Sequence, residues 1–334
     1  MKPKVVVLLQ VTAICSVIVH EMLDSSLNLN SIYSIVVVLI GGFLTAGGAN
    51  AINMWYDRDI DREMKRTENR PIPRGDVSER SALLFGILIS IVGVVWFLFL
   101  SNEVAAFWAS FSILFYVFIY SFWLKRRTPQ NIVIGGIAGS TPPLIGWSVC
   151  EENLEISTNS VLAFGESLFD LGSMMPWFMF VLIFLWTPPH FWALSLYRSN
   201  DYERVGVPMM PNVRGPERTI REMKVYSLLL VLLSLSAPLS YGDLDEEDHL
   251  YHVLGWTTLI LSVWYGSTVW RIDVSEKPDE TGKIGSASYS FFVSMIYLAL
   301  MFLVMVMASF GIIGAIIGAI IAVSSMSKVE LSRV

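Results

Sequence analysis

Three polar residues with helical spacing are the part of this chain best suited to chemistry. Asn53, Asp57 and Asp61 occupy positions i, i+4 and i+8, where a long apolar run gives way to a basic segment. A helix that continues through them places all three side chains on one face. Uncompensated charge at the end of a lipid-buried helix is costly, so such a register indicates a bound partner.

The ligand chemistry of these three residues points to a metal ion. Carboxylate and amide oxygens suit a hard divalent cation such as Mg²⁺, which in turn bridges to phosphate oxygens. The basic segment that follows supplies positive charge for an anion. The pattern therefore predicts a site for a metal ion and a diphosphate at a membrane surface.

The composition indicates what kind of fold must position these residues. The 334-residue chain is 54% hydrophobic and only 16% charged, which is too apolar for a soluble domain of this size. Most of its apolar runs are long enough to cross about 30 Å of hydrocarbon at about 1.5 Å per helical residue. The sequence predicts an all-α, polytopic membrane protein of about nine transmembrane helices. The runs cover residues 5–19, 32–51, 82–100, 104–124, 132–149, 176–197, 225–241, 250–270 and 288–324.

The last apolar run, 288–324, has two interpretations. At about 1.5 Å per residue it would form about 55 Å of helix, which is too long for one ordinary span. It is either one span that projects beyond the bilayer or two short spans that turn near Gly311 or Gly314. Lys328 and Arg333 favour a tenth span with a cytoplasmic C-terminus.

The charges are sorted between alternate loops. Lysine and arginine occur in the N-terminal segment and in every even-numbered loop, whereas the odd-numbered loops contain neither. The positive-inside rule places the N-terminus and all even-numbered loops in the cytoplasm. Topology thus explains the basic residues, and no nucleic-acid partner is expected. The chain shows no transit-type extension at its start, which indicates a prokaryotic plasma membrane. The apolar spans are expected to contact membrane lipid.

The two cysteines, Cys15 and Cys150, lie in or at the end of apolar runs. They show neither metal-binding spacing nor a disulfide framework. We interpret both as small apolar core residues.

Two loops of the chain are alike. The second loop, from Asp57 to Gly75, and the sixth, from Tyr197 to Arg218, both begin with acidic residues and continue as long basic segments. This similarity predicts two pseudo-repeated four-helix halves around a central cavity, within one integral-membrane domain that covers residues 1–334. The halves would span about 1–128 and 129–271, and an extra C-terminal span would cover about 288–324.

Asn53, Asp57 and Asp61 together resemble the first aspartate-rich motif of the intramembrane prenyltransferase superfamily that includes 4-hydroxybenzoate polyprenyltransferase. Within this UbiA-type superfamily the chain is similar to the protohaem IX farnesyltransferase (haem O synthase) family. Four segments carry that resemblance and occur in the expected order along the chain. They are residues 50–71, 139–147, 186–192 and 201–211.

The resemblance implies a reaction and a set of site residues. Haem B, farnesyl diphosphate and water would give haem O and diphosphate, with a hydroxyethylfarnesyl group replacing one haem vinyl group. Asp57 and Asp61 would hold Mg²⁺, and Asn53 would ligate it or orient the site. Asp201 would bring a carboxylate to a second metal ion. Asn50, Arg66 and Arg70 would bind the diphosphate, the two arginines as bidentate clamps.

Two features of the second half refine this expectation. The wider superfamily has a further aspartate four residues after the first acid of its second motif, but this chain has Val205 there, with Glu203 nearby. That departure favours haem over quinone-precursor substrates and weakens the case for a full second metal site. His190 follows Pro188 and Pro189, where a break in the helix can expose a side chain. It would be either a haem axial ligand or an acid/base group.

Other functions compete with haem farnesylation. A prenyltransferase acting on a quinone precursor or a lipid alcohol is one alternative, and Val205 counts against it. A transporter or a haem carrier is an alternative of a different class, since paired halves and midspan prolines occur in transporters. The acids of this chain, however, cluster at helix ends instead of the membrane midplane. The resemblance also implies that haem A synthase or a terminal oxidase uses the product.

Overall fold

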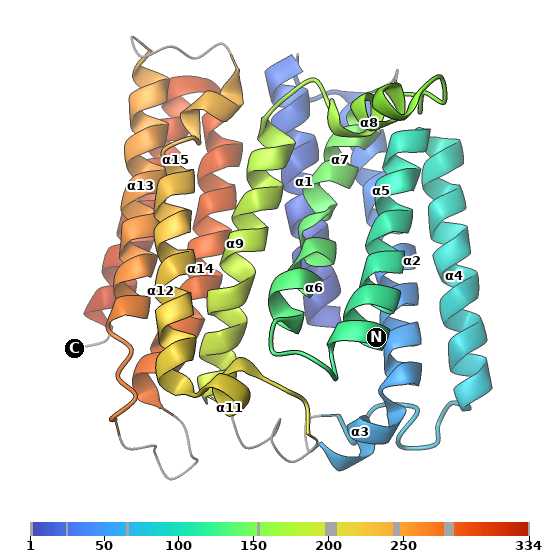
Figure 1. Cartoon of the computed structure of the whole chain (residues 1–334). Coiled ribbons are helices and arrows are strands. Elements are labelled where there is room, and N and C mark those ends of the chain that lie inside the picture. The colour runs from blue at the N-terminus through green and yellow to red at the C-terminus, as the bar shows by residue number, and fades with distance from the viewer. Residues whose placement is uncertain are drawn as a thin grey trace. The chain divides into compact units, whose positions relative to one another are not determined.

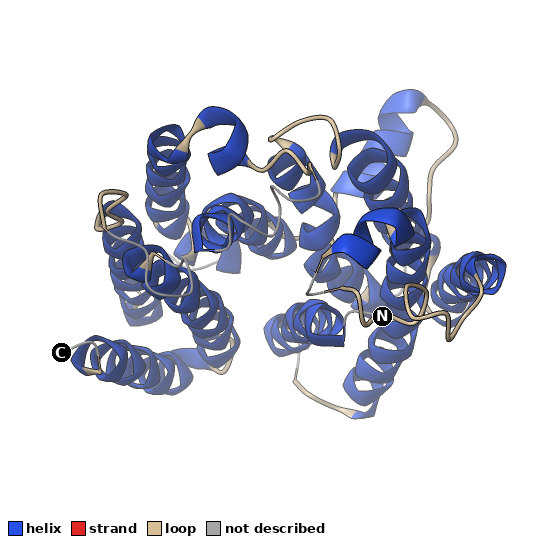
Figure 2. Cartoon of the chain, turned by 90° about the horizontal axis from the view of Figure 1, so that it is seen from below, coloured by secondary structure: helices blue, strands red, loops and turns tan. Residues whose placement is uncertain are grey.

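The computed structural model describes residues 3–24, 26–64, 67–151, 154–197, 206–242, 248–276 and 284–332. Every regular element in these ranges is a helix, as Figure 2 shows. The all-α prediction is therefore confirmed. The helices group into two compact units, one made of residues 1–21, 27–172 and 200–208, the other of residues 22–26, 173–199 and 209–334. The predicted halves, 1–128 and 129–271, describe a repeat in topology and stay a prediction.

Eight helical segments in the described residues are long and apolar enough to cross a membrane, so this is a multi-pass membrane protein. The predicted runs 225–241 and 250–270 correspond to two further long helices, α12 (Pro216–Ser234) and α13 (His249–Trp270). α12 begins with a charged segment, and α13 is rich in aromatic and hydroxyl side chains. These two helices are not among the eight, whereas the single run 288–324 contributes two of the eight, Gly285–Ala308 and Gly311–Leu331. Together these two differences account for eight segments where nine were predicted.

The first unit contains most of the predicted site. In this unit α2 (Leu29–Tyr56) packs along α4 (Glu79–Leu100), as Figure 1 shows. A Cβ atom at Gly48 would lie 2.8 Å from the carbonyl oxygen of Gly86, so glycine lets the two backbones touch. The other helices of this unit are α1 (Pro3–Asp24), α3 (Arg58–Glu63), α5 (Glu103–Leu114), the π-helical η1 (Phe115–Leu124), α6 (Asn131–Ser140), α7 (Pro142–Cys150) and α8 (Val161–Phe169).

α2 ends at Tyr56, but its hydrogen-bond pattern continues into α3. The backbone N–H of Asp57 donates to the carbonyl of Asn53 at 2.9 Å, and the N–H of Asp61 donates to the carbonyl of Asp57 at 2.8 Å. Asp57 itself has φ −85° and ψ 4°, outside the helical region. The expected continuous helix is therefore interrupted at one residue, yet the i, i+4, i+8 register survives because both bonds keep the helical spacing.

The second unit is built around α14 (Gly285–Ala308), which packs against α9 (Met175–Tyr197), α13 and α15 (Gly311–Leu331). The run 288–324 thus forms two helices, the second of the two alternatives above. Gly311 makes the turn with φ +81°, a conformation that favours glycine. This unit also contains α11 (Met210–Arg214), α12 and the short 3₁₀ helix η2 (Pro238–Tyr241).

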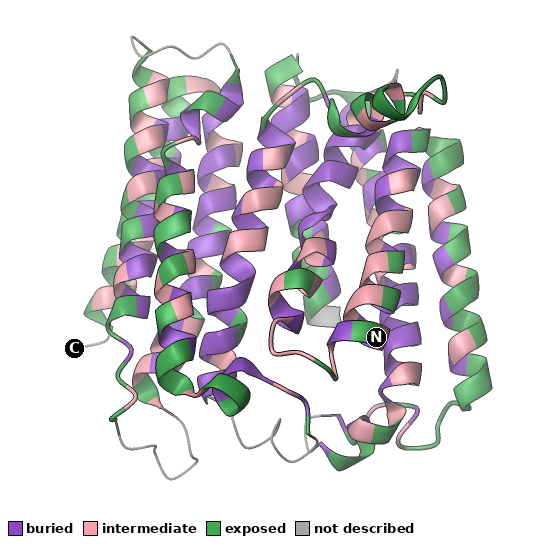
Figure 3. Ribbon diagram, viewed as in Figure 1, coloured by how far each residue is buried: buried purple, intermediate pink, exposed green. Residues whose placement is uncertain are grey.

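Burial differs between the helices of each unit, as Figure 3 shows. In the first unit α4 presents a row of exposed apolar side chains, including Leu84 at 68% and Phe99 at 78% exposure. In the second unit α15 does the same, with Ile313 at 72%. Such faces are stable in hydrocarbon, because the helices satisfy their own backbone polar groups.

Candidate active site at the end of α2

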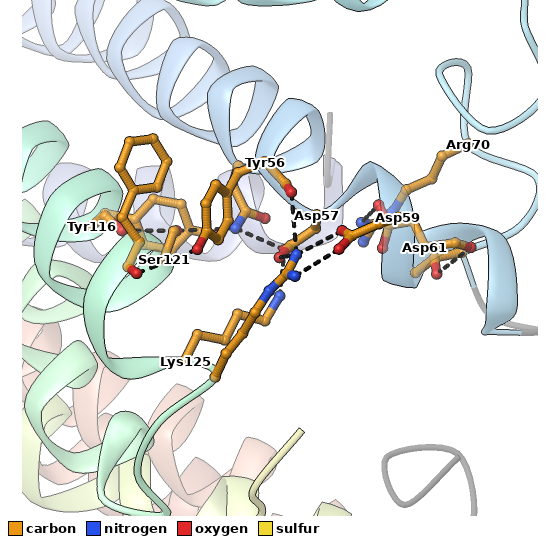
Figure 4. A network of polar contacts seen from close by, with 12 residues as sticks. Tyr56, Asp57, Asp59, Asp61, Arg70, Tyr116, Ser121 and Lys125 are labelled. Carbon is orange, nitrogen blue, oxygen red and sulfur yellow. Dashed lines mark hydrogen bonds and ion pairs between the residues drawn. The ribbon is translucent and has the colours of Figure 1, made fainter. Parts of the chain in front are cut away.

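The site begins with Asn53 and Asp57, which are both fully buried at the end of α2. The Asn53 amide Nδ2 donates to the Oδ2 atom of Asp57 and to the Oγ atom of Ser121, each at 3.0 Å. Ser121 belongs to η1, so the amide joins two helices (Figure 4). The two motif residues therefore lie together, as their helical spacing predicts, and the Asn53 amide contacts the Asp57 carboxylate.

Asp57 faces two cations from the segment after η1. Lys125 Nζ forms an ion pair with its Oδ2 atom, and the Arg126 guanidinium lies 3.7 Å from its Oδ1 atom. That Oδ1 atom is buried and has no hydrogen-bond partner among the described residues. A buried carboxylate oxygen is costly to leave unpaired, so this atom is a position where a cation would be stabilising.

Asp61 lies one turn further, on α3, and is 2% exposed. Its carboxylate pairs with Arg70 Nη1, and Thr67 Oγ1 donates to its backbone carbonyl at 3.0 Å. The loop after α3 is thus folded back so that Arg70 faces an acid of the motif. Arg70, which was predicted to bind the diphosphate, therefore lies at the acidic cluster.

Asp59, unlike the two buried acids, has a side chain that is 59% exposed, and it shares the Arg126 guanidinium with Asp57. It forms two hydrogen bonds with Arg126, both 2.6 Å long. This contact, first of all through the Arg126 hydrogen bond, lowers the pKa of Asp59 to about 2 and raises that of Arg126. Arg126 also lies over the ring of Tyr56, with the guanidinium carbon 4.8 Å from the ring centroid.

The π-helical turn of η1 explains how this segment reaches the site. Ser121 Oγ donates to the carbonyl of Tyr116, and the N–H of Lys125 donates to the carbonyl of Tyr120 at 2.8 Å. Both bonds span five residues instead of four, and such widened turns often occur at functional sites. In the sequence the positive-inside pattern explains Lys125 and Arg126 as topology residues only, and no residue pattern points to Ser121. The Lys-Arg-Arg run at the end of a span was the available signal.

A pocket of about 440 Å³ lies beside this network. Asp57 and Asp61 do not line it, and its walls come from partly buried and exposed residues around them. They are Trp55, Tyr56, Arg58, Asp59, Arg62, Glu79 and Arg126.

The remaining predicted residues have different outcomes. Asn50 is buried, and its Nδ2 atom donates to the Ala46 carbonyl of its own helix at 2.8 Å. Arg66 and Asp201 lie outside the described residues, as do Glu203 and Val205. Their places at the site stay predictions.

His190 belongs to the second unit. Its Nδ1 atom lies 2.6 Å from Ser294 Oγ, and its ring is stacked on Trp186 and on Phe291, at centroid distances of 4.1 and 4.8 Å. α9 runs without interruption from Met175 to Tyr197 with Pro188 and Pro189 inside it. The predicted break before His190 was therefore wrong, because the helix accommodates both prolines. The histidine is buried between aromatic rings.

The structure thus brings buried carboxylates and basic side chains together at the end of a membrane helix. The family model described as the UbiA prenyltransferase family matches residues 12–286. The chain belongs to the UbiA prenyltransferase family. The sequence-based family assignment is thereby confirmed.

Curated relatives and a solved structure agree with that membership. The chain is 38% identical over 305 residues to the protoheme IX farnesyltransferase of Bartonella henselae, covering 90% of this chain and 86% of the relative. It is 44% identical over 259 residues to that of Parvibaculum lavamentivorans, covering 77% and 72%. A UbiA homologue from Archaeoglobus fulgidus, solved with DMAPP and Mg²⁺, superposes with a TM-score of 0.56 at 17% identity, over 90% of this chain and 96% of that one. That likeness supports the fold.

Proposed function

We propose that this protein is a haem B farnesyltransferase. It converts haem B, farnesyl diphosphate and water to haem O and diphosphate. The bond between C1 of the farnesyl group and the diphosphate oxygen breaks, and its electron pair leaves with diphosphate. C1 bonds to the terminal vinyl carbon of haem, water adds its hydroxyl to the inner carbon, and one proton is released. The relatives named for this reaction, at 38% and 44% identity, support the proposal.

The observation that carries the proposal is the buried acid pair. Asp57 and Asp61 are 0% and 2% exposed, and each already faces a basic side chain, Lys125 and Arg70. The Asp57 Oδ1 atom, which accepts no hydrogen bond among the described residues, and the hard oxygen donors fit Mg²⁺. The ion would be held by Asp57 and Asp61 and, when bound, would neutralise charge on the departing diphosphate.

The basic residues then have a second role. With a cation held by the two carboxylates, Lys125 and Arg70 would be available to donate to phosphate oxygens, and these two basic side chains would hold the leaving group. Arg66, four residues before Arg70, would add a second clamp, and Asn50 would bind nearby on α2. Asp201 would supply an acid from the second aspartate motif. Asn53 and Ser121 keep the Asp57 carboxylate oriented throughout.

His190 is our candidate for the haem side of the reaction. Ser294 engages Nδ1 and the two aromatic rings cover the imidazole faces, which leaves Nε2 as the nitrogen for an iron or a proton. We assign the protein to the plasma membrane with its N-terminus and even-numbered loops in the cytoplasm. In that orientation the acid site faces the cytoplasm. Haem A synthase or a terminal oxidase would receive the product.

A direct assay tests the function. The purified protein is incubated with haem B, farnesyl diphosphate and Mg²⁺, and the extracted haem is identified by liquid chromatography–mass spectrometry. Haem O that disappears with a chelator and in Asp57→Ala would support the proposal. Prenyl transfer to an aromatic acceptor without haem O would keep the family and reject the haem assignment. If a folded sample were inactive in both assays, the proposed prenyltransferase activity would be rejected.

A further inference from the structure

A second polar cluster lies at the other end of the first unit. A ring nitrogen of His20, a carboxylate oxygen of Glu21 and the Sγ atom of Cys150 all lie within 4.8 Å of one another. His20 and Glu21 come from the last turns of α1, and Cys150 ends α7. Histidine, carboxylate and cysteine are the ligand types of transition-metal sites in proteins.

The packing of α1 on α7 fixes these residues. Ser16 Oγ donates to the Pro143 carbonyl at 2.7 Å, one turn before His20. A Cβ atom at Gly146 would lie 2.3 Å from the Ala13 carbonyl oxygen, so the two backbones touch there. Cys150 follows Gly146 by one turn. Two close contacts between the helices therefore hold the ligand residues in register.

The histidine carries the observation that points to a ligand. His20 is 7% exposed, and its Nε2 atom lies 3.0 Å from the Glu151 carboxylate. Its Nδ1 atom is buried and has no hydrogen-bond partner among the described residues. Histidines that bind metals commonly donate their second N–H to a carboxylate, which fixes the tautomer. Glu151 would take that place, and Nδ1 would face the ion.

The surroundings of the cluster match this arrangement. Ser31 Oγ donates to Glu21 Oε2 at 2.6 Å, which orients the carboxylate, and Trp147 packs edge-on against the His20 ring at 4.7 Å. Asn102 Nδ2 donates to the carbonyls of Ser148 and Glu151 and so fixes the end of α7. The carboxylate, the imidazole and the end of α7 are each held before any ion arrives.

We propose that His20, Glu21 and Cys150 form a binding site for a divalent transition-metal ion that accepts thiolate ligands, such as Zn²⁺. Binding replaces the thiol proton, which is released to solvent, by a metal–sulfur bond. Neutral imidazole, one carboxylate and one thiolate then balance a divalent ion, so the buried centre carries no net charge. A thiolate ligand disfavours Mg²⁺ and Ca²⁺.

This site is separate from the acid pair. Ser31, which holds Glu21, stands near the start of α2, and Asp57 follows its end. At about 1.5 Å per residue, α2 puts them roughly 40 Å apart. Figure 1 shows α7 and α3 at opposite ends of the first unit. The metal site therefore lies at the membrane face away from the proposed diphosphate site and does not rest on the proposed function.

Zinc titration of the full-length protein tests the proposal. The purified protein is titrated with Zn²⁺ in excess Mg²⁺, which saturates hard oxygen sites, and the metal retained after desalting is counted. We expect one zinc per chain. His20→Ala and Cys150→Ser should each raise the Kd about tenfold or more. Cys15→Ser is the matched control. Cys15 is half-buried like Cys150 and lies on α1, the helix that carries His20, but it is not a proposed ligand. This variant should leave the Kd for zinc unchanged.

Cobalt provides an independent readout that needs no stable variant. Co²⁺ bound at Cys150 gives a thiolate-to-metal charge-transfer absorption in wild type and in Cys15→Ser. Glu21→Gln keeps that band with weaker affinity, and Asp57→Ala leaves it unchanged. Absence of the band in wild type, or zinc affinity equal in wild type, His20→Ala and Cys150→Ser, would overturn the proposal.

Discussion

Lys125 forms an ion pair with the fully buried carboxylate of Asp57, 68 residues earlier in the chain. The lysine side chain is 17% exposed, so the pair lies at the border between the helices and the surface. The same carboxylate is the one we propose for Mg²⁺. The lysine therefore supplies a counterion for the buried acid in the free protein and already lies beside the place where diphosphate would bind.

Replacing Lys125 tests its two proposed roles, as the counterion of Asp57 and as a donor to the diphosphate. Lys125→Met leaves a buried carboxylate without its main counterion, so we expect a loss of about 3 kcal/mol in stability and a lower thermal midpoint. Haem O formation should fall at least about tenfold at saturating Mg²⁺, because a phosphate donor is lost. Lys125→Arg keeps the charge and should recover most of both. Equal behaviour of the methionine and arginine variants in both assays would show that the ion pair has neither role.

Asp57 and Asp59 form a matched pair of acids two residues apart. Asp57→Asn removes only a charge at the buried position and should lower the rate about 100-fold or more, because the proposed metal ligand is weakened. Asp59→Asn makes the same chemical change at a side chain that is 59% exposed, and we expect less than about a threefold effect. Initial rates of haem O formation over a Mg²⁺ series measure both. A larger loss in Asp59→Asn than in Asp57→Asn would contradict the proposed site.

The part of this site that is local in sequence could be predicted. Asn53, Asp57 and Asp61 are related by helical spacing, and the structure keeps that spacing through hydrogen bonds between neighbouring turns. Ser121 and Lys125 could not be placed, because they reach α2 through long-range packing and a π-helical turn that no residue pattern announces.

The same limit applies elsewhere in the chain. His20 and Cys150 are 130 positions apart in sequence and meet only because α1 packs on α7. The apolar run 288–324 left its turn undecided, since Gly311 and Gly314 were equally plausible and only the backbone shows which one has positive φ.

The Asp59–Arg126 pair gives a pH dependence with a defined sign. The pKa of Asp59 is lowered from 3.8 to about 2 in the folded protein. A depressed carboxyl pKa stabilises the folded state above the unfolded value, and this contribution is lost as the pH falls through the folded value. The thermal midpoint of wild type minus that of Asp59→Asn should therefore be constant above about pH 5 and vanish between about pH 4 and 2. The difference is small because the pair is exposed. A difference that grows on acidification would have the wrong sign.

The role of His190 can be determined by combining the absorption spectrum of the haem B complex with the rate of haem O formation. If Nε2 binds haem iron, His190→Ala should shift the Soret band of the haem B complex, and added imidazole should restore it. If His190 acts on a proton, the Soret band should stay unchanged while kcat falls about 100-fold.

Ser294→Ala is the control, because it removes the Nδ1 partner while leaving both stacked rings in place. It should weaken either role by a few fold, since an imidazole that has lost one hydrogen bond is less well oriented. A His190→Ala protein with unchanged spectrum and unchanged rate would remove the histidine from the haem side of the reaction. It would then be a packing residue between Trp186 and Phe291.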